Sequence, residues 1–486
     1  MSDQVFNNYI AGEWQPGNNG SIANISPADT RDVIGQYAQA DSAQTEAAIQ
    51  AATAGQAEWA KSGLEQRYSV LMAIGDELIA RKDELGNILA REEGKTLAEG
   101  AGEVYRSGQF FHYYAAEVLR QMGETAESVR PGIEIETRRE PVGVVGIITP
   151  WNFPTATGAW KIAPALAFGN AVVWKPANQV PASAWALTEI ISRQGLPAGT
   201  FNLVMGPGSQ VGDVLINSRD VNALTFTGSL ETGRKVASAT AGNLVKCQLE
   251  MGSKNALIVL DDADLDNAVE CAVGGAFGGT GQKCTASSRL IVTEGIHDRF
   301  VEAMEARMAK LVVGHPLKEG VHIGAVADAR QLEQNVEYFE QAKREGGNLV
   351  CGGEVFTETF NGEEVEGYYM KPALFTNTTN DMTINREEAF APIACVIKVK
   401  DYEEALATLN DTNFGLTGGI CTQSLQHATH FKRNAKTGCV MVNLPTAGTD
   451  YHVPFGGRKD SSFGPREQGT YAKEFYTVVK TSYIRA

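Results

Sequence analysis

From residue 142 onward the chain repeats one arrangement, in which a short, almost wholly apolar run is followed by a segment with helical periodicity. Strands buried on both faces have this continuous apolar composition, and their alternation with helices is typical of a parallel sheet covered on both sides. The arrangement therefore predicts an α/β fold of the doubly wound, open-sheet kind. The apolar runs are residues 142–148, 171–174, 201–205 and 223–226, and helices are expected at 182–193 and 211–217.

A second alternation begins just after Gly252. It contains apolar runs at 255–260 and 393–397 and a helix around 298–311. A chain of 486 residues has room for two to four domains of about 100–200 residues each. We therefore expect two α/β lobes, the first of them Rossmann-like, that meet near Gly252.

The first third of the chain has a different texture. Residues 8–14 look like a short strand and turn, and residues 42–119 are rich in Ala, Glu and Leu at helical spacing. Residues 133–140 alternate apolar and charged side chains, which is the period of a half-exposed strand. This strand lies outside the α/β alternation, so we expect it to be an edge or pairing element.

The charge and the cysteines narrow the possible partners. The net charge is −16, which disfavours nucleic acid and anionic membranes because both are bound through basic surfaces. The first eight residues contain no basic and apolar signal pattern, and no apolar run approaches the roughly 20 residues that span a bilayer. Seven dispersed cysteines without a C-x-x-C pair favour neither a disulfide framework nor a metal site. We expect a cytoplasmic protein without a bound metal.

Cys284 is the strongest candidate for a reactive residue. It follows Gly278, Gly279 and Gly281, and bare backbone lets a carbonyl group approach the sulfur while leaving amide N–H groups free. The thiolate is the nucleophilic form, and a cation such as Lys283 would lower the thiol pKa. A buried structural cysteine is the usual interpretation of a lone cysteine; the other motifs decide against it here.

Two polar residues come directly after apolar runs, where ligands gather in open α/β sheets. Asn152 stands between two prolines at positions 150 and 154, and its amide could donate to a developing oxyanion. Alone, it would more often form an Asx-type turn. Lys175 ends the next run and could meet a cofactor hydroxyl or phosphate, with a solvated edge lysine as the alternative.

A third and a fourth site complete this set. Gly228 and Ser229 join a strand to a helix whose N-terminus suits a pyrophosphate, although an ordinary capped turn is equally compatible. The segment that runs through Gly233 matches neither the G-x-G-x-x-G fingerprint nor a P-loop, which argues against nucleotide triphosphatase activity. Glu250 stands between Leu249 and Met251 and would serve as a general base if desolvation raised its pKa. A surface ion pair is the alternative.

Together these residues resemble the aldehyde dehydrogenase superfamily over nearly the whole chain. Ala391 departs from the family pattern, which usually has glycine there, and its extra methyl should crowd the backbone and shift how the nicotinamide ribose is held. The motifs that carry the resemblance are PWNFP at 150–154, KP at 175–176, FTGS at 226–229, LEMG at 249–252, GQKC at 281–284, EEAFAP at 387–392 and PFGG at 454–457.

The resemblance implies oxidation of an aldehyde to a carboxylic acid with NAD or NADP. Cys284 would form a thiohemiacetal and then a thioester, and the Asn152 amide would hold the oxyanion. Glu250 would activate the water that releases the acid. Lys175 would count with these catalytic residues and also bind the cofactor. The cofactor-binding residues implied are Trp151, Lys175, Asn178, Gly228, Ser229, Gly233, Glu388 and Phe390.

The resemblance also bears on cofactor and substrate choice. NAD-using members often carry a glutamate where this chain has Asn178, so NADP should be accepted or preferred. Residues 443–454 and 463–469 resemble the 2-oxoglutarate semialdehyde (2,5-dioxopentanoate) dehydrogenases of sugar-acid breakdown. The distal carboxylate of such a substrate would be held by a cation or several donors. Candidates are Arg106, Ser287 and Thr449, although Arg106 has the ordinary alternative of a surface helix residue.

The resemblance further implies three parts and a homo-oligomer. The coenzyme-binding domain would comprise residues 1–122 and 142–252, and the catalytic domain residues 253–460. Residues 123–141 and 470–486 would form an oligomerisation arm, which gives a dimer or a tetramer.

Three other functions compete with this one. A CoA-acylating dehydrogenase would not need Glu250 as a base, and a cysteine hydrolase would need a histidine–acid pair beside Cys284. A non-catalytic protein on the same fold would be expected to lack Cys284 or Glu250.

Overall fold

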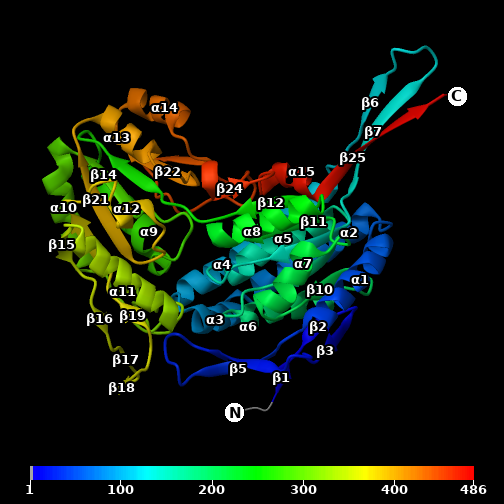
Figure 1. Cartoon of the computed structure of the whole chain (residues 1–486), viewed down its shortest axis with the longest axis horizontal. Helices are drawn as coiled ribbons and strands as arrows, with labels where there is room; N and C mark the ends of the chain where they lie inside the picture. The colour runs from blue at the N-terminus through cyan, green and yellow to red at the C-terminus, as the bar shows by residue number, and fades with distance from the viewer. Residues whose placement is uncertain (1–3, 486) are drawn as a thin grey trace.

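The computed structural model describes residues 4–485. Residues 1–3 and 486, which the predicted domains and the N-terminal signal analysis include, lie outside the described part. Figure 1 shows two sheets with helices on their faces and a narrow third sheet that projects from the body. The predicted α/β fold with two open sheets is confirmed. Within residues 4–485, no helix combines the length and the apolar character that crossing a membrane requires.

The first sheet has eight strands, and its five central strands are parallel. The apolar runs predicted at 142–148, 171–174, 201–205 and 223–226 all form strands of this sheet, because each is buried on both faces. Its order is β24 (Ser462–Phe463), β12 (Lys246–Glu250), β11 (Ala223–Thr227), β8 (Val144–Ile148), β9 (Ala171–Lys175), β10 (Phe201–Leu203), β2 (Asn8–Ile10) and β3 (Glu13–Gln15).

Helices cover both faces of the first sheet. Neighbouring residues of β8 show this directly, since Val145 packs in one buried cluster with α2, α4, α5 and α6, and Val144 packs in another with α1, α7 and α8. The segment predicted as a helix at 211–217 begins with a π-helical turn at Gly208–Gly212. The helices are α1 (Ser42–Trp59), α2 (Leu64–Ala80), α3 (Lys82–Glu93), α4 (Leu97–Val118), α5 (Pro154–Ala167), α6 (Pro181–Ser192), α7 (Asp213–Asn217) and α8 (Leu230–Gly242).

The second sheet has seven strands, and the chain enters it between Glu250 and Ala256. Only β15 at its edge runs antiparallel to its neighbour in this sheet of the described chain. The order is β15 (Asn348–Cys351), β20 (Ala373–Thr376), β21 (Ile393–Val399), β14 (Arg289–Thr293), β13 (Ala256–Val259), β22 (Thr417–Cys421) and β23 (Cys439–Val442).

Two helical layers cover the second sheet. Leu257 packs toward α9 and α10, whereas Ile258 packs toward α13 and α14. The helix expected at 298–311 is α10, which begins and ends a few residues earlier. The helices of this half are α9 (Leu265–Phe277), α10 (Glu294–Met308), α11 (Ala329–Arg344), α12 (Thr383–Arg386), α13 (Tyr402–Asn410) and α14 (Leu425–Asn434).

The third sheet is antiparallel and joins distant parts of the chain. The strand predicted at 133–140 is β7 (Glu134–Pro141), which lies between β6 (Glu124–Glu127) and β25 (Thr477–Ile484). A short helix, α15 (Lys473–Tyr476), leads into β25. The sheet stands away from the body in Figure 1. Its role in assembly, like the domain boundaries, stays a prediction.

Smaller sheets complete the fold. One of them has the order β1-β5-β4 and lies beside the first sheet. Its strands are β1 (Val5–Phe6), β5 (Val33–Ala38) and β4 (Ser21–Ile25). The two hairpin-like pairs are β16 (Val355–Phe356) with β19 (Tyr369–Met370), and β17 (Thr359–Phe360) with β18 (Glu363–Glu364).

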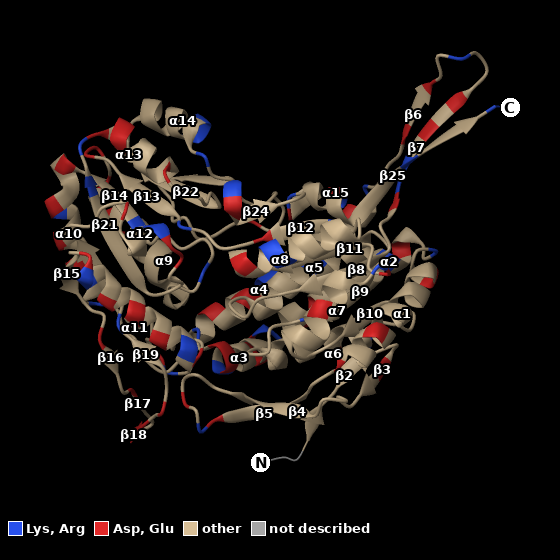
Figure 2. Ribbon diagram, viewed as in Figure 1, with Lys and Arg blue, Asp and Glu red and all other residues tan. Residues whose placement is uncertain are grey.

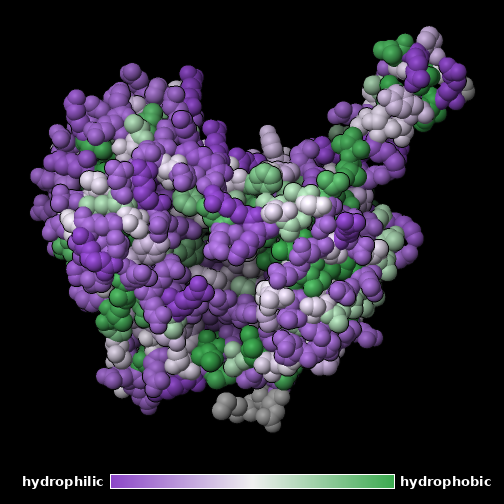
Figure 3. Space-filling model, in the orientation of Figure 1, coloured by the Kyte–Doolittle hydropathy of each residue, from purple (hydrophilic) through white to green (hydrophobic). Residues whose placement is uncertain are grey.

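The surface and the interior differ in the expected way. Charged residues occur mainly on the outer helices and loops, while the central strands are largely uncharged (Figure 2). The face seen in Figure 3 is mostly hydrophilic and is hollowed between the two halves of the molecule. A few charged residues are buried nevertheless, among them Lys95, Glu103 and Lys161. Buried charges require partners, and these three have them, since Lys95 pairs with Glu103 and Lys161 pairs with Glu467.

Candidate active site

A cavity of about 410 Å³ brings together residues that are far apart in the sequence. Cys284 and Asn152 both line it, as do Arg106, Thr449 and Gln468. The described residues around it include no histidine. A cysteine hydrolase of the kind considered above would require an imidazole beside the thiol, so the cavity argues against that alternative.

The backbone before Cys284 takes a path that glycine makes possible. Gly279, Thr280 and Gly281 are all left-handed, with φ of 59°, 58° and 70°. A Cβ atom on Gly281 would lie 2.2 Å from the carbonyl oxygen of Ala391, which no side chain can tolerate. The glycines therefore serve the turn itself as well as access to the sulfur. Asn255 fixes the loop on the far side by donating to the Cys284 carbonyl oxygen at 2.7 Å.

The electrostatic setting of Cys284 differs from the sequence prediction. Burial raises the pKa of the thiol above its usual value, and the carboxyl groups of Glu388 and Glu250 raise it further. The Lys283 ammonium turns toward Glu99, with 4.0 Å between Nζ and Oε1, and burial lowers its own pKa. The expectation that Lys283 lowers the thiol pKa is therefore wrong, because its side chain is engaged elsewhere.

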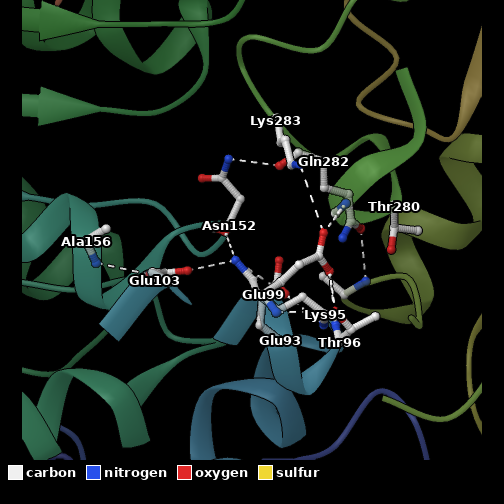
Figure 4. Close-up of polar contacts among 12 residues, drawn as sticks. Glu93, Lys95, Thr96, Glu99, Glu103, Asn152, Ala156, Thr280, Gln282 and Lys283 are labelled. Carbon is white, nitrogen blue, oxygen red and sulfur yellow. Dashed lines mark hydrogen bonds and ion pairs between the residues drawn. The ribbon is translucent and has the colours of Figure 1, made fainter. Parts of the chain in front are cut away.

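Asn152 lies in the loop between β8 and α5 and faces the loop of Cys284. Its Nδ2 donates to the carbonyl oxygen of Gln282 at 2.9 Å, two residues before the cysteine. Its own carbonyl oxygen accepts from Lys95 Nζ at 2.7 Å, as Figure 4 shows. The two hydrogen bonds hold the amide at the cavity wall. This is the position from which an amide could stabilise an oxyanion formed at the sulfur.

Glu250 ends β12 and is almost completely buried. Its Oε2 accepts from the Ser462 hydroxyl at 2.5 Å, and within residues 4–485 it forms no ion pair, which removes the surface-pair alternative. Burial raises the pKa of its carboxyl group well above the usual value, and Glu467 adds to the rise. A carboxyl group with a raised pKa is more basic than an exposed one, which is the property a general base requires.

Polar groups that lack partners gather at the ends of β9 and β11. Among residues 4–485, Lys175 Nζ donates only to the carbonyl oxygen of Pro176, at 3.1 Å, and burial lowers its pKa to about 8. The Thr227 hydroxyl is buried without any partner within residues 4–485. Such groups are normally satisfied, so a ligand with hydroxyl and phosphate groups fits this region. Asn178, three residues beyond Lys175, is exposed.

The turn into α8 is built tightly. A Cβ on Gly233 would lie 2.3 Å from Met251 Sδ, and one on Gly228 would meet the Phe226 ring at 2.5 Å. The Ser229 side chain already accepts from the Thr232 N–H at 3.4 Å, so it caps its own helix. The free N–H groups of the helix start, rather than this hydroxyl, are what the turn offers to a phosphate.

Glu388 and Phe390 lie between α12 and β21 of the second half, and Phe390 contacts Trp151 from the loop after β8. Glu388 Oε1 accepts from the Ser253 N–H at 2.8 Å, and burial raises the pKa of this carboxyl to about 7. The Phe390 ring stands edge-on to Trp151, with 5.5 Å between centroids, and its backbone is left-handed with φ of 55°. Ala391 is buried in an apolar cluster beneath this turn, so packing surrounds its additional methyl.

Of the three residues predicted to bind substrate, two line the cavity and one does not. Arg106 is half-buried on α4, lines the cavity and lies over the Tyr451 ring at 5.3 Å, and its contact with substrate stays a prediction. Thr449 also lines the cavity. Ser287 does not, because its side chain is buried against Gly275 of α9.

Several residues that line the cavity belong to no motif recognisable in the sequence. Gln468 is buried with φ of 61°, and its Oε1 has no partner within the described chain. Glu93, Lys95 and Glu103 form a charged group at the cavity wall. No local pattern could have identified these residues, since their significance lies in contacts with distant segments. Residues 4–485 contain no group of three or more His, Cys, Asp or Glu side chains that could hold a metal ion.

A thiol, an amide donor and a buried carboxyl group beside a dinucleotide-compatible cleft are suited to covalent oxidation of a carbonyl compound. The sequence model of the aldehyde dehydrogenase family matches residues 14–482. The chain therefore belongs to the aldehyde dehydrogenase family and is an NAD(P)-dependent oxidoreductase.

Particular relatives extend this assignment. The chain is 42% identical over 479 residues to an alpha-ketoglutaric semialdehyde dehydrogenase of Bacillus subtilis (strain 168), which covers 98% of both proteins. Its fold matches the crystal structure of an NADP dependent enzyme of E. coli with a TM-score of 0.94 and 34% identity, over 99% of this chain and 98% of that one. It also matches a betaine aldehyde dehydrogenase from Staphylococcus aureus in complex with NAD+, with a TM-score of 0.95 and 32% identity, over 99% and 95% of the two chains.

Proposed function

We propose that this protein oxidises 2-oxoglutarate semialdehyde (2,5-dioxopentanoate) to 2-oxoglutarate. The observation that carries the proposal is Arg106, a cation that shares one cavity with Cys284 and has no carboxylate partner among residues 4–485. A substrate with a carboxylate at one end and an aldehyde at the other could reach both residues. The similarity to the semialdehyde dehydrogenase of Bacillus subtilis supports the same substrate class.

The first chemical step belongs to Cys284. Its thiolate adds to the aldehyde carbon, a carbon–sulfur bond forms, and the carbonyl electron pair moves to oxygen. The Asn152 amide and the Cys284 N–H would hold this oxyanion, and one such donor typically contributes about 2.7–4 kcal/mol to lowering the barrier. Loss of a hydride from the same carbon re-forms its carbonyl group and leaves a thioester on Cys284; a bound nicotinamide dinucleotide would supply the hydride acceptor.

The second half of the reaction needs a base. Glu250 takes a proton from water, the oxygen adds to the thioester carbon, and the carbon–sulfur bond breaks to return the thiolate. In this structure the Glu250 carboxyl is turned toward Ser462. Its raised pKa makes it a stronger base than an exposed glutamate, so it can accept the proton once it faces the thioester.

Cofactor residues follow from the same cleft. Lys175, Thr227 and the start of α8 would meet ribose and phosphate groups, and Glu388 with Phe390 would contact the nicotinamide ribose. We propose that NADP is accepted alongside NAD. Asn178 supports this, because it places no carboxylate against a 2′-phosphate.

The test compares two aldehydes in an Arg106→Gln variant. The expected result is a loss of about 10- to 100-fold in kcat/KM for 2-oxoglutarate semialdehyde, since a charge-assisted hydrogen bond contributes about 1.5–3 kcal/mol. Turnover of pentanal, an uncharged aldehyde of similar length, should change less than threefold. Arg120→Gln is the matched control, because Arg120 follows the same helix and pairs with Glu117 on the surface. Equal losses on both aldehydes would refute an anionic-substrate pocket.

A further inference from the structure

Three buried charged residues form one group at the wall of the substrate cavity: Glu93, Lys95 and Glu103, here called the Lys95 cluster. Their exposed fractions are 2%, 4% and 6%. Lys95 lies in the connection between α3 and α4, and Glu103 lies two turns into α4. Although burial opposes it, the carboxylates of Glu103 and Glu93 raise the pKa of Lys95, so its side chain stays an ammonium.

The Lys95 ammonium reaches out of its own segment to the loop of Asn152. Nζ donates to the Asn152 carbonyl oxygen at 2.7 Å and to Glu103 Oε2 at 2.8 Å. It also stands 4.2 Å above the Phe153 ring centre. In the described chain, the hydrogen bonds of Asn152 go only to Lys95 and to the carbonyl oxygen of Gln282. Lys95 thus provides one of the two hydrogen bonds that hold Asn152 in the described chain.

Glu103 holds the other side of the same loop. Its Oε1 accepts from the N–H groups of Thr155 at 2.9 Å and Ala156 at 3.0 Å, which are free donors in the first turn of α5. A carboxylate at a helix N-terminus is electrostatically favourable. Glu103 therefore binds the start of α5 through one oxygen and the Lys95 ammonium through the other. The loop of Asn152 is held at Asn152 by Lys95 and at Thr155 and Ala156 by Glu103.

The first turn of α4 also holds the loop of the candidate catalytic cysteine. Glu99 Oε1 accepts from the Gly279 N–H at 2.7 Å, while its Oε2 accepts from the Thr96 N–H at 3.1 Å in a capping box. Figure 4 shows these contacts converging from the start of α4 on the loops of Asn152 and Cys284. The start of α4 and the residues just before it thus position both the Asn152 loop and the Cys284 loop.

Stability alone does not account for this arrangement. A buried ion pair contributes little net stability, because desolvation offsets most of the attraction, and apolar residues of similar volume often do as well. Geometry does account for it, since an oxyanion donor must be placed within a few tenths of an ångström. A main-chain carbonyl held by a buried ammonium leaves the attached side chain little freedom.

We propose that Lys95, supported by Glu103, is a positioning residue that orients the Asn152 amide toward the oxyanion formed at Cys284. It acts on the reaction through Asn152 and does not touch the substrate's reacting carbon. The proposal rests on the role proposed for Asn152 above.

The test is a double-mutant cycle of Lys95→Met and Asn152→Ala, with kcat for the aldehyde and the dissociation constant of NADPH measured for each variant. Asn152→Ala should lower kcat by about 10²–10³-fold. Lys95→Met should lower kcat by about 10- to 100-fold, with NADPH affinity unchanged. In the Asn152→Ala background, Lys95→Met should cost less than about threefold, because the group it positions is gone.

Additive effects would overturn the proposal, because a general structural defect would lower kcat equally in both backgrounds. Full turnover in Asn152→Ala would overturn the role proposed for Asn152 and this inference with it. If Lys95→Met keeps full turnover while Asn152→Ala loses activity, the role proposed for Lys95 is wrong and the role proposed for Asn152 stands.

Two further variants guard the experiment. Lys246→Met is the matched control, since Lys246 also donates to main-chain carbonyl oxygens, of Glu474 and Thr477, but does so outside the cavity. It should leave kcat unchanged. If Lys95→Met does not fold, Glu103→Gln replaces it in the cycle, because the glutamine can still accept from the start of α5 while losing the charge that holds Lys95. A loss of about three- to tenfold that vanishes with Asn152→Ala supports the proposal, and a loss that persists there overturns it.

Discussion

Replacing Lys175 by methionine is expected to make the cofactor-free protein more stable at pH 7 and to weaken its binding of NADPH. Lys175 ends β9 with its ammonium buried, and in the described part of the chain its one hydrogen bond goes to the carbonyl oxygen of Pro176. A buried charge without a counter-charge destabilises the folded protein until an anionic or hydroxyl-bearing ligand binds to it. Methionine keeps most of the volume and removes the charge.

The size of the effect follows from the pKa. Burial lowers the pKa of Lys175 from 10.5 to about 8, and each pKa unit corresponds to about 1.4 kcal/mol, so the buried charge costs about 3 kcal/mol at pH 7. Methionine also leaves the Pro176 carbonyl oxygen without a donor, which lowers the stability of the variant by about 1 kcal/mol. The net gain of about 2 kcal/mol should raise Tm by about 2 °C, because unfolding 486 residues carries an entropy of about 1 kcal/mol/K.

The sign of the pH dependence provides a second check. Below pH 8 both the folded and the unfolded chain carry the proton on Lys175, so the full cost of the charge is present. Between pH 8 and 10.5 the unfolded chain binds more protons than the folded one, and the stability of the wild type therefore rises with pH. The advantage of the variant should have nearly vanished at pH 9.5.

The assay is differential scanning calorimetry of both proteins without cofactor at pH 7.0 and pH 9.5, with NADPH binding followed by fluorescence titration. Lys235→Met serves as control, because Lys235 is exposed and pairs with Glu231 on the surface of α8. It should change neither Tm nor affinity. A Lys175→Met protein that melts below the wild type at pH 7, or whose advantage is the same at both pH values, would refute the reasoning.

Three further outcomes are expected. Because burial and two carboxyl groups raise the pKa of Cys284, alkylation of this residue by iodoacetamide, followed by mass spectrometry of its peptide, should accelerate about tenfold per pH unit from pH 7 to 9; a plateau below pH 8 would contradict this. Glu250→Gln should retain a rapid burst of reduced cofactor while steady-state turnover falls at least about 10²-fold, and loss of the burst in stopped-flow absorbance would be the contrary result. Asn178→Glu should worsen kcat/KM for NADP by at least about tenfold, some 1.4 kcal/mol, and leave NAD nearly unchanged; an unaltered ratio of the two would disprove the role of this position.

Much of the fold could be predicted because its signals are local. A strand buried on both faces has to be apolar along its whole length, so the composition of 171–174 or 223–226 identifies the strand wherever it lies. Residues 133–140 could be predicted as a strand from their alternation, but not as the middle of a three-stranded sheet, because the partner β25 comes more than 300 residues later.

The candidate site could be predicted only in part. The glycines before Cys284 and the prolines around Asn152 mark their loops directly in the sequence. The direction of a long, flexible side chain has no such mark, which is why Lys283 was expected beside the thiol and is found beside Glu99. The same limit applies to Ser287, which was a candidate for the substrate pocket and whose side chain is buried away from the cavity.

By itself the sequence determined the alternation of strands and helices, the candidate cysteine and the family, because backbone preferences and motif chemistry depend on neighbouring residues. Tertiary structure alone decided which charges meet. The ammonium of Lys95 lies 2.7 Å from a carbonyl oxygen 57 residues away, and Glu467, more than 200 residues after Glu250, raises the pKa of that carboxyl group. Contacts of this kind depend on how whole layers pack, and burial then gives them energies that the same residues would not have in water.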